Sequence, residues 1–186
     1  MNNIGTISIE TERLLLRRFE YSDCASMLQN WVADENVQLN YGEPVYSTEE
    51  EVKGLLDKYI AGYQRGDFYR WAIIDKALNE CAGQIAFFLV DSKNHFAEIE
   101  YCIGTKFQRR GYATEATKAL IRFGFEKIDL HKVQICARPV NKASRGVIEK
   151  CGFTYEGTLR DYFFKDGHYE SRMYFSILQS EYLEKK

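Results

Sequence analysis

A short stretch at residues 108–113, QRRGYA, puts two guanidinium groups beside a glycine where a strand-like pattern gives way to a helix-like one. The start of a helix exposes unpaired backbone N–H groups with a partial positive charge, and glycine lets the chain approach a ligand closely. Gln108, Arg109 and Arg110 add side-chain donors, and arginine can grip phosphate in a bidentate fork. The stretch therefore predicts a pyrophosphate site.

The alternative interpretation of the same stretch is an ordinary arginine-bearing loop that starts a helix. Average residue usage makes the pattern [QR]-x-x-G-x-[GA], which this stretch fits, appear by chance in roughly one chain of this size in five. The stretch lacks the spacing of a P-loop, which argues against nucleoside triphosphate hydrolysis. It also lacks the second glycine spacing and the later acidic residue of a dinucleotide site, which argues against NAD.

Two carboxylates form a second candidate site in the preceding strand-like run. The strand period of two places Glu98 and Glu100 on one face and Ile99, Tyr101 and Ile103 on the other. Neighbouring carboxylates raise one another's pKa, and partial burial adds to this, so one of them approaches the range of a general base. The alternative is a polar strand face whose acids are hydrated or paired with lysines.

Hydrophobic periodicity predicts the elements that position these groups. Aromatic and β-branched runs indicate strands, and i, i+3, i+4 spacing after capping residues indicates helices. The turn sequence at residues 165–168, with Asp166 and Gly167 at its centre, predicts a hairpin. The expected strands cover residues 9–19, 68–75, 80–91, 96–104, 132–139, 157–164 and 169–178, and the expected helices cover residues 22–33 and 47–65, a segment from Gly111, and a segment capped by Asn141 and closed by Gly152.

Bulk composition bounds the class of protein. The 186 residues with 45% hydrophobic content suit one domain over residues 1–186, of class α/β. A net charge of -2 predicts no nucleic-acid partner, and the lack of a long apolar run predicts no membrane span, so a soluble cytoplasmic chain is expected. Five scattered cysteines and three separated histidines predict reduced thiols and no metal site. Packing is the expected role of Cys151.

The chain resembles the GCN5-related N-acetyltransferases (GNAT), closest to the RimJ/RimL-type branch that contains ribosomal-protein and spermidine acetyltransferases. The resemblance rests on residues 97–153, AEIEYCIGTKFQRRGYATEATKALIRFGFEKIDLHKVQICARPVNKASRGVIEKCGF, with TERLLLRRF at residues 11–19 and KDGHYESRMYFSIL at residues 165–178. It covers nearly the whole chain. It implies a GNAT fold with a mixed, mostly antiparallel sheet, flanking helices and two splayed strands.

The resemblance also implies acetyl-coenzyme A as cosubstrate. The turn would bind its pyrophosphate, the backbone before the turn would line its pantetheine arm, and Asn141 would touch the same arm. The cofactor residues so assigned are Tyr101, Cys102, Ile103, Gln108, Arg109, Arg110, Gly111, Tyr112, Ala113, Thr114, Asn141 and Ser144.

Catalytic roles follow from the same resemblance. Holding an ammonium of pKa about 10.4 deprotonated at pH 7 costs about 4 to 5 kcal/mol, so a base is useful. Glu98 occupies the family's glutamate position, but Glu100 stands where glycine is usual, so the choice between them, or a water held by either, stays open. Many relatives carry a tyrosine at the position of Ile148. The branch carries serine in its N-x-x-S pattern, so Ser144 is the candidate proton donor or thiolate partner. The alternatives are that Ser144 only solvates a helix N–H and that backbone N–H groups suffice without it.

The expected function is acetyl transfer to a primary amine. The expected acceptor is a protein N-terminus, with a polyamine or an aminoglycoside as alternatives. The segment near residues 34–50 is expected to form acceptor loops, which vary among such folds. The rival from another class is a non-catalytic acyl-coenzyme A binding module. A homodimer is compatible with the branch.

Overall fold

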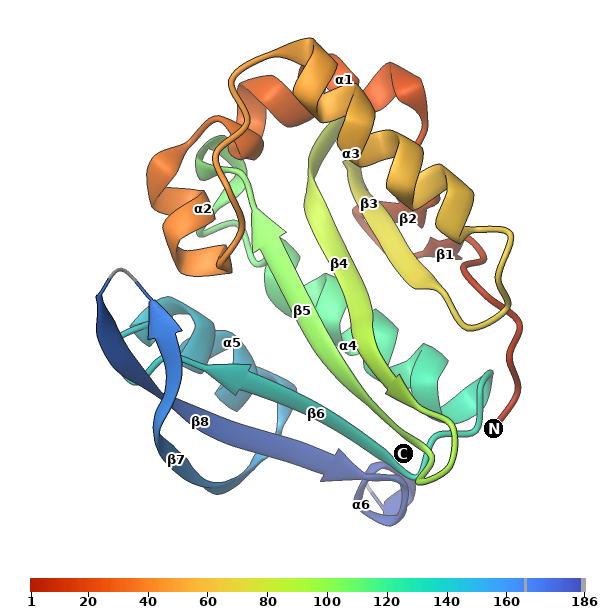
Figure 1. The fold of residues 1–186 in the computed structure, drawn as a ribbon. Helices are drawn as coiled ribbons and strands as arrows, with labels where there is room; N and C mark the ends of the chain where they lie inside the picture. Colours follow the sequence, from red (N-terminus) through yellow and green to blue (C-terminus); the bar gives the residue numbers. More distant parts are fainter. Residues whose placement is uncertain (166, 185–186) are drawn as a thin grey trace.

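The computed structural model describes residues 1–165 and 167–184, and these form one eight-stranded sheet (Figure 1). The strand order is β1-β2-β3-β4-β5-β6-β8-β7, and every neighbouring pair is antiparallel except β5 and β6. The expected mixed, mostly antiparallel sheet is therefore confirmed. The strands are β1 (Ile9–Glu10), β2 (Leu14–Arg17), β3 (Tyr69–Asp75), β4 (Glu80–Asp91), β5 (Phe96–Ile103), β6 (Lys132–Ala137), β7 (Thr154–Lys165) and β8 (His168–Leu178).

Helices cover both faces of this sheet. Helices α1 to α3 pack on one face, and α4 and α5 lie on the other (Figure 1). The helices are α1 (Cys24–Met27), which follows a 3₁₀ turn (Tyr21–Asp23) and runs into a π-helical turn (Leu28–Val32), α2 (Glu35–Tyr41), α3 (Glu49–Gly62), α4 (Tyr112–Glu126), α5 (Lys142–Cys151) and α6 (Gln179–Glu184). Within the described chain, no helix is both long enough and apolar enough to cross a bilayer.

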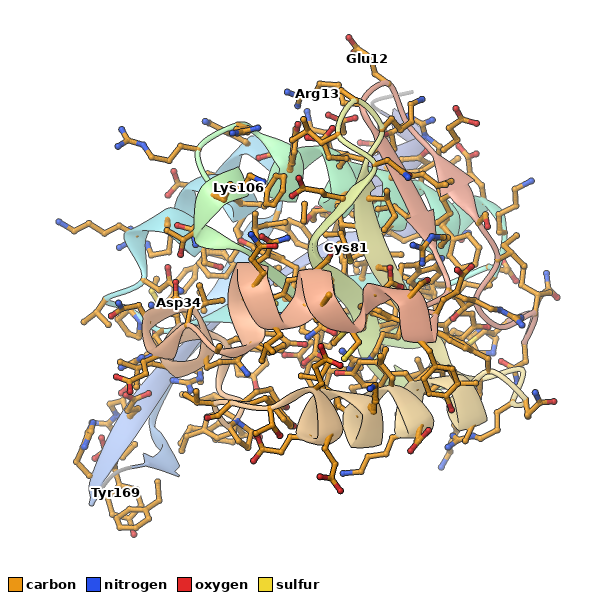
Figure 2. All side chains as sticks on the ribbon, turned by 90° about the horizontal axis from the view of Figure 1, so that it is seen from above. Glu12, Arg13, Asp34, Cys81, Lys106 and Tyr169 are labelled. Atoms are coloured by element: carbon orange, nitrogen blue, oxygen red, sulfur yellow. The ribbon has the colours of Figure 1, made fainter. Side chains whose placement is uncertain are left out.

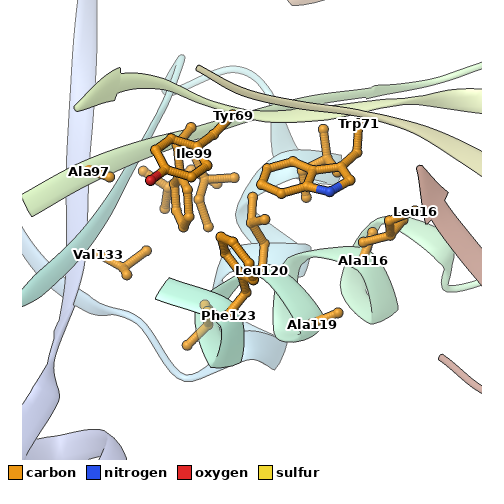
Figure 3. Close-up of a cluster of buried hydrophobic side chains, with 14 of the residues drawn as sticks. Leu16, Tyr69, Trp71, Ala97, Ile99, Ala116, Ala119, Leu120, Phe123 and Val133 are labelled. Carbon is orange, nitrogen blue, oxygen red and sulfur yellow. The ribbon is translucent and has the colours of Figure 1, made fainter. Parts of the chain in front are cut away.

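The main core lies between the sheet and α4. Trp71 of β3 packs with its ring centroid 5.3 Å from that of Phe123, and Leu120 of the same helix is fully buried (Figure 3). The spacing of these apolar positions put one side of α4 toward the sheet. A second cluster, which includes Trp31 and Leu56, fills the space under α1 and α3. The sheet is therefore fixed from both sides, and its central strands can hold a site.

Local sequence explains where the site-forming helices begin and end. At α5 the Asn141 side chain accepts a hydrogen bond from the Ser144 N–H at 3.0 Å, and Gly152 ends the helix with φ of 81°. At α4 the N-cap is Gly111, with φ of 84° and no side-chain cap. The predicted starts of both helices are confirmed, and α4 begins with its N–H groups uncapped.

Three sequence predictions need correction. The run at residues 9–19 is two strands rather than one, because the Thr11 hydroxyl and N–H bond the Leu14 backbone and form a turn. The segment at residues 34–50 contains α2, which begins at an Asp34 cap and ends at Gly42 with φ of 93°. The helix expected over residues 22–33 is instead a succession of 3₁₀, α and π turns. At the predicted hairpin, Asp166 lies outside the described residues, and β7 and β8 pair on either side of it.

Candidate active site where β5 and β6 diverge

The parallel strands β5 and β6 pair along only part of their length. Their register runs from Phe96 with Lys132 to Ile99 with Ile135, after which β5 continues to Ile103 and β6 to Ala137 without further pairing. β5 remains paired with β4 through Ile103. The arrowheads of β5 and β6 point apart in Figure 1. Within the described chain, this divergence leaves the end of β5 without a strand partner on its β6 side.

The turn before α4 lies at the open end of the divergence. In the described chain, the backbone N–H groups of residues 109–114 donate to no protein acceptor. Arg109 has φ of 61° and Gly111 has φ of 84°, so the backbone here turns through left-handed conformations. Consecutive N–H groups in such turns converge on one point and bind anions. The exposed Arg109 and Arg110 side chains stand beside them.

Distant residues brace this turn. Arg13, in the turn before β2, donates from Nη1 to the Arg110 carbonyl at 2.8 Å and from Nε to Glu115 at 2.7 Å. The buried Tyr112 side chain donates its hydroxyl to Asp75 at 2.6 Å, and the Arg13 guanidinium lies over its ring at 5.0 Å. This braced turn lies at the opposite end of the molecule from the β7–β8 hairpin, as the positions of Arg13 and Tyr169 show in Figure 2. The turn is therefore held in place by Arg13 and by the buried Tyr112 side chain.

The end of β5 faces the divergence with alternate peptide groups. The Gly104 N–H bonds the Ala82 carbonyl of the β4 side at 2.9 Å, whereas the Ile103 carbonyl accepts from Gln108 Nε2 at 3.0 Å. Since successive peptide groups in a strand point to opposite sides, the backbone groups of Tyr101 and Ile103 face β6. Gln108 thus ties the turn to the strand with the side chain that was predicted to bind pyrophosphate.

Cys102 and Thr114 complete the predicted cofactor set. The Cys102 side chain is buried in the cluster under α1 and α3, and burial raises the pKa of its thiol to about 12. Thr114 and Ala113 are half-buried at the start of α4, and the Thr114 carbonyl accepts from the Cys151 thiol at 3.7 Å. Burial raises the pKa of Cys151 to about 11, which is consistent with the expected packing role.

Ser144 closes the other side of the divergence. It is the third residue of α5, and its N–H is already bonded by Asn141. Tyr101 of β5 donates its hydroxyl to Ser144 Oγ at 3.2 Å. Burial raises the pKa of Tyr101 to about 12, so this hydroxyl keeps its proton at neutral pH. Because a serine hydroxyl accepts through its lone pairs and still donates its own hydrogen, Ser144 retains a donor that can point into the divergence.

Glu98 lies where β5 and β6 still pair. Its residue is 4% exposed, and its Oε2 accepts from Gln134 Nε2 of β6 at 2.6 Å. Burial raises the pKa of Glu98, against the lowering effect of hydrogen bonds from Gln134 and Cys136. Burial, and after it the nearby Glu98 carboxylate, raise the pKa of the Cys136 thiol to about 12. Glu98 is therefore a carboxylate with increased proton affinity, and none of the described residues forms an ion pair with it.

Glu100 has a different environment two residues further on. Its Oε1 accepts from Arg70 Nη2 at 2.5 Å and from the Tyr41 hydroxyl at 2.7 Å. Arg70 also bonds Gln84 at 3.0 Å and stacks over the Tyr59 ring. The carboxylate that departs from the family pattern is thus engaged in an ion pair that connects β3, β5 and α2.

The structure brings most of the sequence-predicted residues to the β5–β6 divergence, whereas the Cys102 side chain lies under α1 and α3 and Glu100 is paired with Arg70. Several important neighbours of these residues were not found from the sequence. Arg13 belonged to the quoted run at residues 11–19, but no pattern there indicated its contact 97 residues away. Strand register brings Gln134 and Cys136 next to Glu98. The placement of β3 and α2 brings Arg70 and Tyr41 next to Glu100. Among the described residues, no group of three or more potential ligands is arranged to hold a metal.

Comparisons with known proteins agree with this geometry. A family model described as "Acetyltransferase (GNAT) domain" matches residues 13–154. An uncharacterized N-acetyltransferase of Bacillus licheniformis is 30% identical over 175 residues, covering 94% of this chain and 98% of that protein. The [ribosomal protein uS5]-alanine N-acetyltransferase of Escherichia coli is 26% identical over 180 residues, covering 92% and 91%.

Solved structures give the same result. A GNAT-family acetyltransferase from Bacillus anthracis superposes with a TM-score of 0.84 and 28% identity, over 94% of this chain and 100% of that one. Spermidine N-acetyltransferase from Vibrio cholerae, in complex with CoA and spermine, gives a TM-score of 0.77 and 26% identity, over 93% and 99%. The chain is thus an N-acetyltransferase that belongs to the GNAT family, in the branch with ribosomal-protein and spermidine acetyltransferases among its members.

Proposed function

We propose that residues 1–186 act as one domain that transfers the acetyl group of acetyl-coenzyme A to the N-terminal α-amine of a protein. The observation that carries this proposal is a row of unpartnered N–H groups at residues 109–114, which opens onto the β5–β6 divergence. If the pyrophosphate of acetyl-coenzyme A is held there, its linear pantetheine arm can run along β5 toward Ser144 and Glu98. These two residues can serve the two ends of an acyl transfer.

The cosubstrate fits the donor side of the divergence. The pyrophosphate would accept from the backbone of residues 109–114, with Arg109 and Arg110 as charged side chains beside it. The pantetheine amides would pair with the Tyr101 and Ile103 backbone groups that face away from β4, and Asn141 would border the same arm. Cys102, with its side chain on the opposite face, would contribute at most its peptide backbone.

Glu98 is the proposed base, in preference to Glu100. The Glu100 carboxylate is held by Arg70, whereas Glu98 forms no ion pair with any described residue and burial raises its pKa. Because Glu98 is buried, a bridging water would carry the proton from the attacking amine. An α-amine has a pKa near 8, so it needs much less help from the base than a polyamine with a pKa above 10. A carboxylate with a raised pKa is matched to an α-amine.

Ser144 is the proposed partner of the leaving sulfur. The amine nitrogen attacks the thioester carbonyl, the C–S bond breaks, and the electron pair of that bond stays on sulfur. Ser144 Oγ–H would donate a hydrogen bond to this thiolate, since its oxygen is oriented by Tyr101 and its N–H is already satisfied by Asn141. The proton lost by the amine leaves through Glu98.

Two kinds of amine are candidate acceptors. Both a ribosomal-protein alanine acetyltransferase and spermidine acetyltransferases are relatives of this chain. The α-amine is preferred on the pKa argument, and a polyamine is the second candidate. A homodimer is compatible with the branch.

Two measurements test the proposal. Calorimetry with coenzyme A should show binding, and thiol release from acetyl-coenzyme A should require a peptide with a free N-terminus rather than its N-blocked form. Ser144→Ala should lower turnover by about tenfold or more, while Ser92→Ala, at an exposed turn, serves as the matched control. Absence of coenzyme binding would refute the whole proposal, and turnover confined to spermidine would refute the choice of acceptor.

A further inference from the structure

A second charged cluster, outside the residues assigned above, lies at the ends of β6 and β8. Arg138, directly after β6, donates from Nη2 to Glu170 Oε1 at 2.5 Å. Arg172 of β8 donates from Nη1 to Glu170 Oε2 at 3.0 Å and to the Ser171 carbonyl at 3.3 Å. The exposed His168 imidazole lies 3.5 Å from the same carboxylate. The Arg138–Glu170–Arg172 cluster is therefore held by one central acid.

The cluster has an excess of positive charge. It contains two guanidinium groups, which are always protonated, and one carboxylate. The Arg138, Glu170 and Arg172 side chains are 20%, 10% and 14% exposed, so solvent screens them only in part. Within the described chain, Nε and Nη1 of Arg138 and Nε and Nη2 of Arg172 donate to no protein acceptor. A half-buried cationic pair with spare donors is suited to an added anion.

Strand register puts this cluster on the same face of the sheet as Glu98. Glu98 pairs with Gln134, and its carboxylate contacts Gln134 and Cys136. Arg138 is two residues beyond Cys136, so its side chain emerges on the same face. Cys136 pairs with Tyr174 of β8, and Arg172 and Glu170 precede Tyr174 by two and four residues. All these side chains therefore share one face.

The spacing between the cluster and Glu98 has the length of a short peptide. Each strand residue advances about 3.3 Å, so Arg138 lies about 13 Å beyond Gln134 along β6, and Cys136 lies about halfway. An extended peptide advances about 3.3 to 3.6 Å per residue. A nitrogen held near Glu98 would thus place the backbone of about the fourth residue beside Arg138. The long side chains of arginine and glutamate extend this reach back to the second and third residues.

Aromatic side chains border the same path. The Arg172 guanidinium lies over the Phe163 ring of β7 at 4.4 Å, so this ring fixes the plane of the guanidinium. The Tyr162 ring packs edge-on against Tyr174 at 6.1 Å. Both Phe163 and Tyr162 are exposed on the projecting hairpin. They provide apolar surface for an extended chain next to the cationic donors.

We propose that Arg138 and Arg172 form an acceptor subsite for a carboxylate, so that the preferred acceptor is a peptide N-terminus followed by Asp or Glu within its first residues. The inference rests on the proposed acetylation of α-amines and narrows it to acidic N-termini. Polyamines are disfavoured, because they carry further positive charge into this region. Arg70 already neutralises Glu100, and the two positive charges of Arg138 and Arg172 exceed the single negative charge of Glu170.

The test compares matched peptides with C-terminal fluorescent labels, free N-termini and the sequences Ala-Glu-Glu, Ala-Gln-Gln and Ala-Lys-Lys, together with spermidine. Binding to the coenzyme A-loaded protein is measured by anisotropy, and kcat/KM by thiol release. The acidic peptide should bind about tenfold more tightly than the amide peptide, since a charge-assisted hydrogen bond contributes that much. Arg138→Gln and Arg172→Gln should each remove most of this preference, and Arg160→Gln, at an exposed position on β7, should not.

A third variant separates recognition from folding. Glu170→Gln removes the competing carboxylate, so it should increase affinity for the acidic peptide and leave the amide peptide unchanged. A purely structural ion network would instead give weaker binding of every peptide and a lower unfolding temperature. Equal binding of acidic and amide peptides by the unaltered protein, or a preference for spermidine, would overturn the inference. If peptides bind with this preference but are not acetylated, the acceptor subsite stands and the proposed reaction fails.

Discussion

The donor and acceptor sides of the β5–β6 divergence are built on different principles. On the donor side, residues 109–114 keep their N–H groups without protein acceptors, so the turn is prepared for an anion. On the acceptor side, charged groups are already paired, with Glu100 on Arg70 and Glu170 between two arginines. Glu98 is the exception, since it accepts hydrogen bonds but forms no ion pair within the part of the chain that the structure describes. In the proposed function, cosubstrate binding would rely on backbone N–H groups without protein acceptors among the described residues, and acceptor selection would rely on the balance of charges.

Replacing Glu98, the acceptor-side carboxylate that is not in an ion pair among the described residues, should have the largest effect on kcat. Glu98→Gln keeps the size of the side chain but cannot accept the amine proton, so kcat should fall by about 10²- to 10⁴-fold with little change in coenzyme A affinity. In the unaltered enzyme, kcat/KM should fall as the pH drops through the raised pKa of Glu98, and this acid limb should vanish in the variant. Steady-state rates across pH with one peptide acceptor provide the measurement.

Glu100→Gln is the matched control on the same strand. It weakens the contact with Arg70 and Tyr41, so acceptor KM should change more than kcat, and the acid limb should remain. Loss of the acid limb in this variant, with its retention in Glu98→Gln, would reverse the assignment of the base.

A change at Gly111 breaks the donor side and has the next largest effect. Gly111→Ala puts a Cβ on a residue with φ of 84° and within 3.3 Å of Arg13 Nη2. The left-handed conformation costs an alanine about 1 to 2 kcal/mol, so coenzyme A affinity should fall by about tenfold as the turn shifts. Calorimetric titration would show it. Gly146→Ala, at a helical glycine with open space around its Cβ, should bind coenzyme A normally.

The two sides also differ in how far the sequence could predict them. The turn at residues 108–113, α4 and the Asn141 cap depend on residues close together in the chain, and the structure confirms them as elements. The binding of pyrophosphate by the turn stays a prediction. The helix α2 has visible signals, Asp34 at its start and Gly42 at its end, but its few apolar residues give a weak periodicity. The contacts of Glu98 and Glu100 could not be predicted, because the register of β5 against β6 and the approach of Arg70 involve residues 30 to 36 positions apart.

Tyr101 connects the two sides, and its removal should have a moderate effect. Tyr101→Phe deletes the hydroxyl that orients Ser144, so kcat should fall by about three- to tenfold, which corresponds to one hydrogen bond. In a Ser144→Ala background the same change should have no further effect on kcat, because the group that it orients is gone. Additive losses in the double variant would show that Tyr101 acts on packing alone.

The smallest expected effect concerns stability, and it contrasts Glu98 with Glu115 of the donor side. Burial raises the pKa of Glu98, whereas for Glu115 the hydrogen bonds from Thr11 and Arg13 outweigh burial and lower its pKa. Below the unfolded-state pKa of about 4.3, Glu98 is protonated in both states and costs nothing. As the pH rises, the unfolded chain releases this proton first, so Glu98 destabilises the fold increasingly up to its folded pKa. Glu115 behaves oppositely, and its stabilisation is present above the unfolded pKa and lost as the pH falls through the folded pKa.

Urea unfolding at neutral pH should therefore find Glu98→Gln more stable than the unaltered protein and Glu115→Gln less stable. Both titration-linked differences in stability should shrink toward pH 3. A destabilised Glu98→Gln at neutral pH would mean that its bond with Gln134 outweighs the cost of the buried charge.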